Sequence, residues 1–242
     1  MMNEADIVRA LLGVTRCAAW AHTAPVIGDR VVPARVRAAA CIPLGFAISL
    51  AWAPVSYDEL STAVPSEVLL GLSLGFMARL LFLGVEFGGQ LIGVQLGLGF
   101  AQSYDALSGE ESLATRRIAG GLAGLAFLGM DGLETALRAL SIRGLAERGG
   151  IASIDAILGA GGAVVQAGFR MAGPMLLAGF VANVAVALAA RAAPALNAFS
   201  VMLALFLLVG GFVLFGTIGP LTQEIESVAR MAAETPMRML SL

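Results

Sequence analysis

Long apolar segments joined by short polar stretches set the pattern of this chain. The first segment begins with Asn3 and Asp6 ahead of apolar residues at helical spacing, which predicts a capped helix start. Apolar positions then recur at the three- to four-residue spacing of helices, and no stretch shows the two-residue alternation of a strand. The pattern therefore predicts an all-α fold.

Five further segments are apolar enough for a protein core or a membrane. Residues 38–55 and 198–219 carry no charge, and each is long enough as a helix to reach across a hydrocarbon core of roughly 30 Å. Residues 67–102 would form about 54 Å of continuous helix, so this segment must tilt, break or project from a bilayer. The remaining two apolar segments cover residues 118–140 and 156–190.

Polar residues and prolines mark the predicted helix ends. Ser66 and Glu67, beside Pro65, predict the start of the long apolar helix. Pro43 is expected to kink its helix or to lie in the first turn, and Pro194 predicts a turn because proline disfavours helix at the preceding residue.

Two acidic residues and the tail are interpreted as ordinary helix features. Asp131 and Glu134 lack a nucleophile, histidine or metal-ligand set nearby, so they indicate a polar helix end rather than a catalytic pair. The tail from Thr222 is predicted to be an amphipathic helix, with apolar Ile225 and Val228 on one face.

One polar stripe lies within the long apolar segment. At about 100° per residue, Arg79, Glu86 and Gln90 fall within roughly 40° of one another around a helix. Bare charge is costly in lipid, so the stripe faces either another helix of the same chain, or a second subunit or an aqueous path. Gly75, Gly93 and Gly97 lie on or next to this stripe. A ladder of small residues that would let another backbone approach closely is formed by Gly89, Gly93 and Gly97.

Composition places the chain in contact with lipid, other protein or both. Hydrophobic residues make up 58% and charged residues 13% of the chain, and the mean hydropathy is +0.87, which leaves too few polar groups to cover a soluble globule. The net charge of −2 argues against nucleic-acid binding. For Arg170 and Asn183, inside another apolar segment, subunit contact and internal packing both remain open.

The residue inventory excludes most catalytic chemistry. Cys17 and Cys41 lie in or beside apolar segments and are expected to be buried small side chains rather than a disulfide or zinc site. The single His22 is expected to be a polar residue at a helix end. The chain has no lysine and no phosphate-binding loop motif. We therefore expect neither an enzyme nor a bound cofactor or metal.

Four sequence blocks, in order and spacing, resemble the flagellar biosynthetic protein FliR family, which also includes the type III secretion export apparatus protein SctT of injectisomes. The resemblance extends from about residue 24 to residue 215. The blocks are "APVIGDRVVPARVRAAA" (24–40), "GQLIGVQLGLGFAQSYDALSGEES" (89–112), "FLGMDGLETALRAL" (127–140) and "RAAPALNAFSV" (191–201).

This resemblance implies a subunit of an export gate, the conduit through which unfolded flagellar or effector proteins leave the cytoplasm. In that family, one FliR joins five FliP and four FliQ subunits in a pseudo-hexameric helical cone of hydrophobic hairpins, with FlhB and FlhA as further partners. The chain is expected in the bacterial inner membrane at the flagellar or injectisome basal body. Residues 1–155 would be the FliP-like part and residues 156–242 the FliQ-like hairpin.

The resemblance also assigns a plug loop near residues 97–112, which closes the pore until a substrate opens it. Ala106 stands where the family commonly has proline, a departure that bears on the stiffness of the loop. The residues matched to the plug and its hinges are Gly97, Gly99, Phe100, Tyr104, Asp105, Leu107 and Gly109.

A hairpin turn is assigned in the same way to Arg191, Pro194 and Asn197, although Ala195 replaces the usual glutamine. The loop pattern looks more flagellar than injectisome-like, and SctT of a virulence-type system is the alternative. A stand-alone membrane transporter is a weaker alternative, because such folds are built from inverted repeats and we find none.

Overall fold

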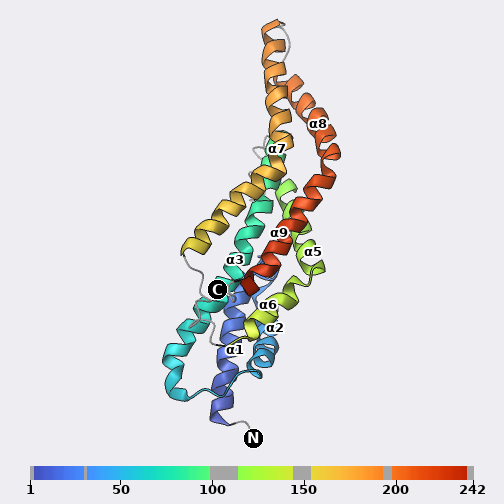
Figure 1. Cartoon of the computed structure of the whole chain (residues 1–242). Helices are drawn as coiled ribbons and strands as arrows, with labels where there is room; N and C mark the ends of the chain where they lie inside the picture. The colour runs from blue at the N-terminus through green and yellow to red at the C-terminus, as the bar shows by residue number, and fades with distance from the viewer. Residues whose placement is uncertain (1–2, 30–31, 99–113, 144–153, 193–197, 239–242) are drawn as a thin grey trace. The chain divides into compact units, whose positions relative to one another are not determined.

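The computed structural model describes residues 3–29, 32–98, 114–143, 154–192 and 198–238, and the regular secondary structure there is entirely helical (Figure 1). The predicted all-α class is therefore confirmed. The helices are α1 (Glu4–Thr23), α2 (Ala34–Ser49), the 3₁₀ turn η1 (Tyr57–Glu59), α3 (Leu60–Gln95), α5 (Ala114–Gly129), α6 (Gly132–Ser141), α7 (Ile154–Ala192), α8 (Ala198–Gly216) and α9 (Ile218–Arg238).

The chain forms two compact units, each assembled from segments far apart in sequence. Unit 1 comprises Met1–Phe82, Gly124–Gly162 and Ala229–Leu242, whereas unit 2 comprises Leu83–Ala123 and Ala163–Val228.

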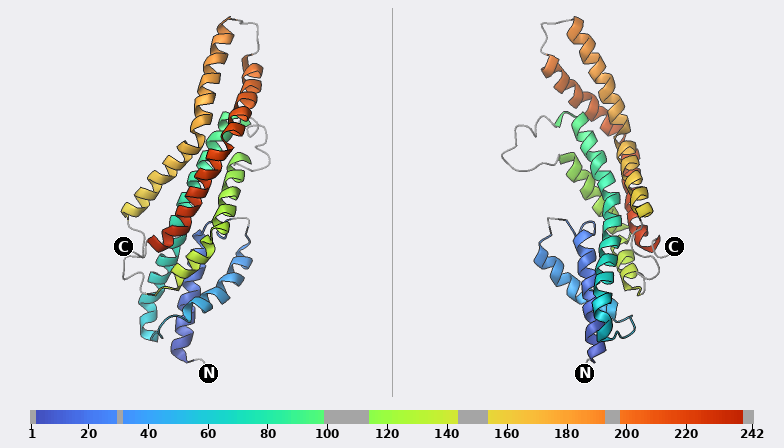
Figure 2. Two further views of the ribbon diagram at one scale, coloured as in Figure 1. Left: turned by 45° about the vertical axis from the view of Figure 1, so that its right-hand side comes forward. Right: turned by 90° about the vertical axis from the view of Figure 1, so that its left-hand side faces the viewer.

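In unit 1, α1 and α2 cross at very short range (Figure 2). The predicted start of α1 is confirmed, because Asn3 and Asp6 form a capping box that satisfies the first backbone N–H groups. At the crossing, a Cβ added to Gly13 would lie 2.3 Å from the carbonyl oxygen of Gly45. Only glycine leaves room for two backbones this close, so this glycine pair sets the approach of the helices.

The core of unit 1 lies along the buried face of α1. His22 is exposed in the last turn of α1, and Cys17 and Cys41 are free thiols in the core, as predicted from the sequence. The buried residues of the main cluster are Cys17, Trp20, Ala21, Ala24, Cys41, Ile48, Leu70, Leu74, Ala136 and Leu140.

In unit 2, the later part of α3 packs against α5 and α7 through glycines. A Cβ on Gly84 would lie 3.1 Å from the Cα of Val164 in α7, and one on Gly89 would lie 2.8 Å from the carbonyl oxygen of Thr115 in α5. The predicted close approach at Gly89 is thus an intramolecular contact. The core beside it consists of Ile92, Leu96, Ala172 and Met175.

Helices α7 and α8 run side by side in unit 2 as a long apolar hairpin (Figure 1). Gly210 of α8 packs against Leu96 and Met175, which fixes one side of the hairpin. Much of the remaining surface of the hairpin is apolar and exposed, with Phe212 at 80% and Leu177 at 70% exposure. The hairpin therefore offers broad apolar faces that the described residues do not cover.

The predicted amphipathic tail is confirmed as α9. Ile225 and Val228 are buried, whereas Arg230 and Glu234 are exposed. A bend of 65° separates α8 from α9 at a short break.

Three sequence predictions about helix ends need correction. The long helix begins at Leu60 rather than at Ser66, and Pro65 lies inside it. Apolar packing explains this outcome, because Leu60 and Val64 contact a buried cluster from α1 and the segment after α2, and this burial outweighs the local cost of proline. The helix ends at Gln95, so the apolar segment 67–102 is not one continuous helix.

The other two corrections concern α2 and the segment 118–140. The uncharged residues 38–55 form a helix only to Ser49, so α2, at 16 residues, is shorter than the predicted span. Residues 118–140 divide into α5 and α6, because Asp131 adopts a left-handed conformation with φ +55° and stops the helix. Asp131 thus lies at a polar helix end, as predicted.

Within the residues that the model describes, two helical stretches are long and apolar enough to cross a membrane: Tyr57–Gln95 and Asp155–Ala192. The bent pair α8 and α9 raises this number to three if it counts as one span. By length and composition, these helices fit a membrane protein.

Candidate functional site

The end of α3 carries the first residues assigned to the plug. Leu96 and Gly97 leave the helix in a turn, and Gly97 has φ +78°, a conformation that a residue with a Cβ adopts only at a cost. A Cβ at Gly97 would also lie 3.0 Å from a methyl group of Leu203 in α8. Glycine is therefore favoured here by the backbone conformation, and an added methyl group would also require Leu203 to shift slightly.

Most of the predicted plug and turn residues lie outside the described part of the chain. Arg191 is described, exposed in the last turn of α7. The predicted residues outside the described ranges are Gly99, Phe100, Tyr104, Asp105, Leu107, Gly109, Pro194 and Asn197.

Glu86, from the predicted polar stripe, forms an ion pair across two helices of unit 2. Its Oε2 accepts hydrogen bonds from Nε of Arg116 at 3.1 Å and from Nη2 at 2.8 Å. The Glu86 side chain is 15% exposed and that of Arg116 is 40% exposed. Such a partly buried pair joins α3 to α5 and neutralises two charges in apolar surroundings.

A shallow groove of about 350 Å³ lies beside this ion pair. Gln90 lines it together with Glu86, so the structure brings these two stripe residues to one site, whereas Arg79 belongs to unit 1. The Oε1 atom of Gln90 is buried and accepts no hydrogen bond from the described residues. The full lining is Leu83, Glu86, Phe87, Gln90, Arg116, Val164 and Val165.

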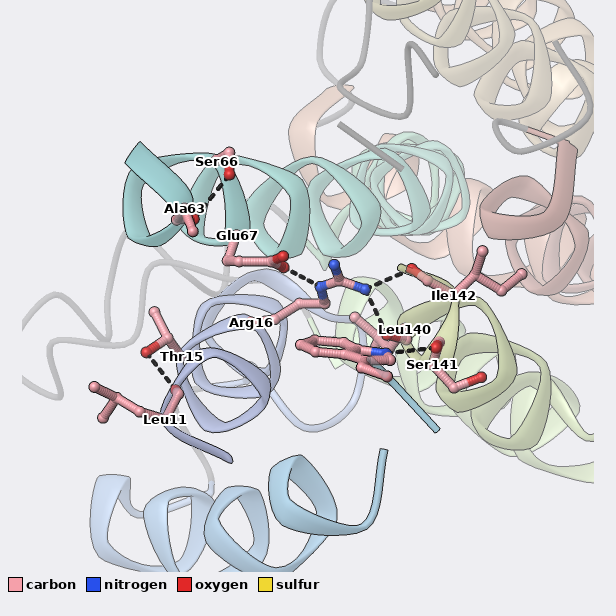
Figure 3. Close-up of polar contacts among 10 residues, drawn as sticks. Leu11, Thr15, Arg16, Ala63, Ser66, Glu67, Leu140, Ser141 and Ile142 are labelled. Atoms are coloured by element: carbon pink, nitrogen blue, oxygen red, sulfur yellow. Dashed lines mark hydrogen bonds and ion pairs between the residues drawn. The ribbon is translucent and has the colours of Figure 1, made fainter. Parts of the chain in front are cut away.

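Unit 1 contains a second charged site, which sequence reasoning missed (Figure 3). Arg16 is completely buried and forms an ion pair with Glu67 of α3. Its Nη1 donates to the carbonyl oxygens of Leu140 and Ile142 at the end of α6, both at 2.7 Å. One guanidinium therefore joins α1, α3 and the end of α6.

Trp52 completes this group of contacts, which we call the Arg16 clasp and define as Arg16, Glu67, Trp52 and the carbonyls of residues 140–142. The guanidinium carbon of Arg16 lies 4.3 Å from the centroid of the Trp52 ring, and the indole N–H donates to the carbonyl oxygen of Ser141 at 2.6 Å. The stacked ring and the ion pair exclude water from a charge that is expensive to bury alone.

A weak sequence signal for the clasp did exist. Arg16 lies on the same helical face of α1 as Leu12 and Trp20, which are buried. A lone arginine on an apolar face indicates a buried charge, but its carboxylate partner is 51 residues away and no local spacing identifies it.

The fold and these sites define a class: an all-helical membrane protein with charges paired inside its helix contacts and an apolar hairpin that lies largely exposed. The model of the family described as bacterial export proteins, family 1, matches residues 7–231 of the chain. The chain therefore belongs to this family, and the curated proteins that it resembles are flagellar biosynthetic proteins FliR.

Three relatives illustrate the match. Flagellar biosynthetic protein FliR of Escherichia coli (strain K12) is 32% identical over 207 residues, which cover 81% of this chain and 78% of the relative. FliR of Caulobacter vibrioides is 30% identical, over 83% of this chain and 84% of the relative. FliR of Bacillus subtilis (strain 168) is 26% identical, over 96% of this chain and 94% of the relative. The chain is thus a component of the flagellar export apparatus.

Proposed function

We propose that this chain is a structural and gating subunit of the flagellar protein export gate. It would form, together with five FliP-like and four FliQ-like subunits, the channel through which unfolded proteins leave the cytoplasm. FlhB-like and FlhA-like proteins would adjoin the assembly, which would lie in the bacterial inner membrane at the basal body. The single observation that carries this proposal is the family match over nearly the whole chain.

Two structural features support a subunit rather than a self-contained transporter. The α7–α8 hairpin exposes large side chains, such as Phe212 and Leu208 at 75% or more, which a neighbouring subunit would cover. The groove at Glu86 and Gln90 also keeps polar groups within an apolar surface. We propose that these two residues and Arg79 contact another subunit or the pore, in addition to their contacts within the chain.

The proposed mechanism is mechanical. Residues 97–112 would form the plug, with Gly97 and Gly99 as points where the backbone turns, and with Phe100, Tyr104 and Leu107 as obstructing side chains. An exported polypeptide would displace the plug, while the driving energy comes from other components. Closing contacts of a few kcal/mol suffice, because a minor open state must stay accessible.

Ion leakage across the inner membrane of living cells tests this proposal. Cells with residues 101–110 deleted should leak ions, whereas cells with the intact chain should not, because a plug seals the pore at rest. The leak should disappear when the FliP-like subunit is also deleted, since the pore is then not assembled.

A matched pair of point variants refines the test. Gly97→Ala should leak weakly, because it strains a turn with φ +78°, whereas Gly121→Ala meets nothing within 4 Å and should remain tight. Intact secretion without leakage in the deletion strain would remove the gating role from this segment. A leak that persists without the FliP-like subunit would favour a stand-alone channel instead.

A further inference from the structure

One face of α7 in unit 2 is exposed along its length. It carries a charged residue first and large apolar residues further along the helix. At 100° per residue, Arg170, Leu177, Val181 and Leu188 fall within about 40° of one another around the helix. Their exposures are 62% for the Arg170 side chain, 70% for Leu177, 66% for Val181 and 63% for Leu188. We call this set the Arg170 face.

Among the residues that the structure describes, the charge on this face has one distant acidic partner. Nη1 of Arg170 lies 3.9 Å from Oε1 of Glu224, beyond the length of a hydrogen bond. The sequence from 156 to 190 contains no other charged residue, so the guanidinium is a lone charge within a long uncharged stretch. An exposed cation beside apolar surface is complementary to a carboxylate that arrives with apolar neighbours.

The apolar part of the face has the dimensions of a helix contact. Leu177 and Leu188 are separated by about 16 Å along the axis at 1.5 Å per residue, which is roughly three helical turns. A partner helix that lies along these turns would cover the apolar side chains and place one residue beside Arg170.

Asn183 indicates that protein, rather than lipid, contacts this hairpin. It is exposed and lies about 140° around the helix from Arg170, so it is on a different side of α7. Acyl chains cannot pair an amide in the middle of an uncharged stretch, whereas another helix can. Exposed polar groups on two sides of α7 therefore favour protein neighbours over lipid.

A second copy of this chain fits the Arg170 face poorly. Residues 156–223 include no aspartate or glutamate, so the apolar hairpin of a copy would bring no carboxylate to Arg170. Residues 156–223 of a second copy therefore cannot supply the complementary charge.

We propose that the Arg170 face binds a helix of a different membrane subunit of the export apparatus, and that this helix places a carboxylate against Arg170 and apolar side chains along Leu177–Leu188. This assignment resolves the choice between internal packing and subunit contact for Arg170, and it rests on the proposed function. The partner is identified by its chemistry: an apolar helix that carries a single aspartate or glutamate near one end.

Photo-crosslinking in cells that contain the complete export apparatus tests the assignment. A photoreactive phenylalanine analogue replaces Val181, and a control analogue replaces Glu226 on the exposed side of α9. The Val181 probe should give one discrete adduct with another export subunit. Peptide mapping should place the adduct on an apolar helix. That helix should carry a carboxylate within about four helical turns of the crosslinked residue.

Charge variants make the test specific. Arg170→Glu should lower the adduct yield about tenfold or more, because like charges would then face one another. Arg170→Lys should retain the adduct, and Arg230→Glu on the exposed side of α9 should leave it unchanged. Replacing the mapped carboxylate by arginine in the Arg170→Glu strain should restore the adduct.

Two results overturn the inference while the proposed function stands: an adduct only with a second copy of this chain, or no protein adduct although the chain co-purifies with other export subunits. An adduct yield that is the same with Arg170→Glu as with arginine also overturns it. If the chain co-purifies with no export subunit at all, both the inference and the proposed function fail.

Discussion

Arg16 in unit 1 and Arg170 in unit 2 are the same residue type in apolar helices, and the chain treats them in opposite ways. Arg16 is completely buried and has a carboxylate, two carbonyls and an indole ring around it. The Arg170 side chain is 62% exposed, with one acidic group 3.9 Å away. The first charge has its carboxylate partner within the chain, although its Nη2 has no hydrogen-bond partner among the described residues, whereas the second is left for a neighbour.

This contrast separates a charge that affects the stability of the folded chain from one that affects assembly of the complex. A charge with all its partners inside one chain affects folding whether or not other subunits are present. A charge with an incomplete set of partners affects the chain itself little and affects the complex more.

The largest effect is expected at the Arg16 clasp. Arg16→Ala should lower the free energy of unfolding by about 3–5 kcal/mol, because it leaves the buried carboxylate of Glu67 unpaired. The measurement is unfolding of the detergent-solubilised chain. Glu67→Gln is the milder companion variant, since it keeps the shape and removes only the charge. A loss below about 1 kcal/mol for Arg16→Ala would show that the clasp is not a buried ion pair.

The glycine crossing of α1 and α2 should have the next largest effect. A Cβ at Gly45 would lie 2.4 Å from the Cα of Val14, so Gly45→Ala should separate the helices and cost about 1–3 kcal/mol. Gly121→Ala in α5 is the matched control, because nothing lies within 4 Å of the added methyl group. The control should be neutral or stabilise by up to about 1 kcal/mol. Equal melting temperatures for both variants would contradict the close crossing.

Ionisation of Cys17 should have a smaller effect on stability, and only in alkaline solution. Burial, assisted by the neighbouring Cys41 thiol, raises the pKa of Cys17 to about 12. The unfolded chain loses this proton near pH 9 and the folded chain retains it, so stability should fall as the pH rises from 9 towards 12.

Thiol labelling checks the same residue at neutral pH. A maleimide reagent should label Cys17 in the denatured chain but not in the native chain, because the thiol is both buried and protonated. Cys17→Ser provides the control for assignment of the label. Rapid labelling of native Cys17 would place this residue outside the core.

The smallest effect on the isolated chain is expected at Arg170. Arg170→Gln should change the free energy of unfolding of the solubilised chain by less than about 0.5 kcal/mol, because the pair with Glu224 is long and exposed. The same variant should reduce the recovery of the assembled complex. A large loss of stability in the isolated chain would erase the distinction between Arg16 and Arg170.

Helix type and face were predictable from local pattern, whereas helix limits and charge partners were not. The apolar spacing of α9 and the capping pair Asn3 and Asp6 act within a few residues, so the sequence displays them directly. The start of α3 at Leu60 depends on packing against Trp52 and Val55, which no local rule includes.

Partners of charged groups depend on contacts between distant segments. Glu86 was identified as a residue that needs a partner, but its pairing with Arg116 follows from the approach of α5 to Gly89. Arg16 and Glu67 come together only when α1 lies against α3. The plug residues were assigned by family resemblance alone and remain a prediction.

Purification of the tagged chain from cells, in mild detergent and with its full set of export subunits present, tests the central claim most directly. We predict that FliP-like and FliQ-like subunits co-purify in one defined complex, and that Arg170→Glu reduces this complex whereas Arg230→Glu does not. Recovery of the wild-type chain alone, folded and monodisperse, would contradict the account, because its exposed apolar faces would then need no protein neighbour.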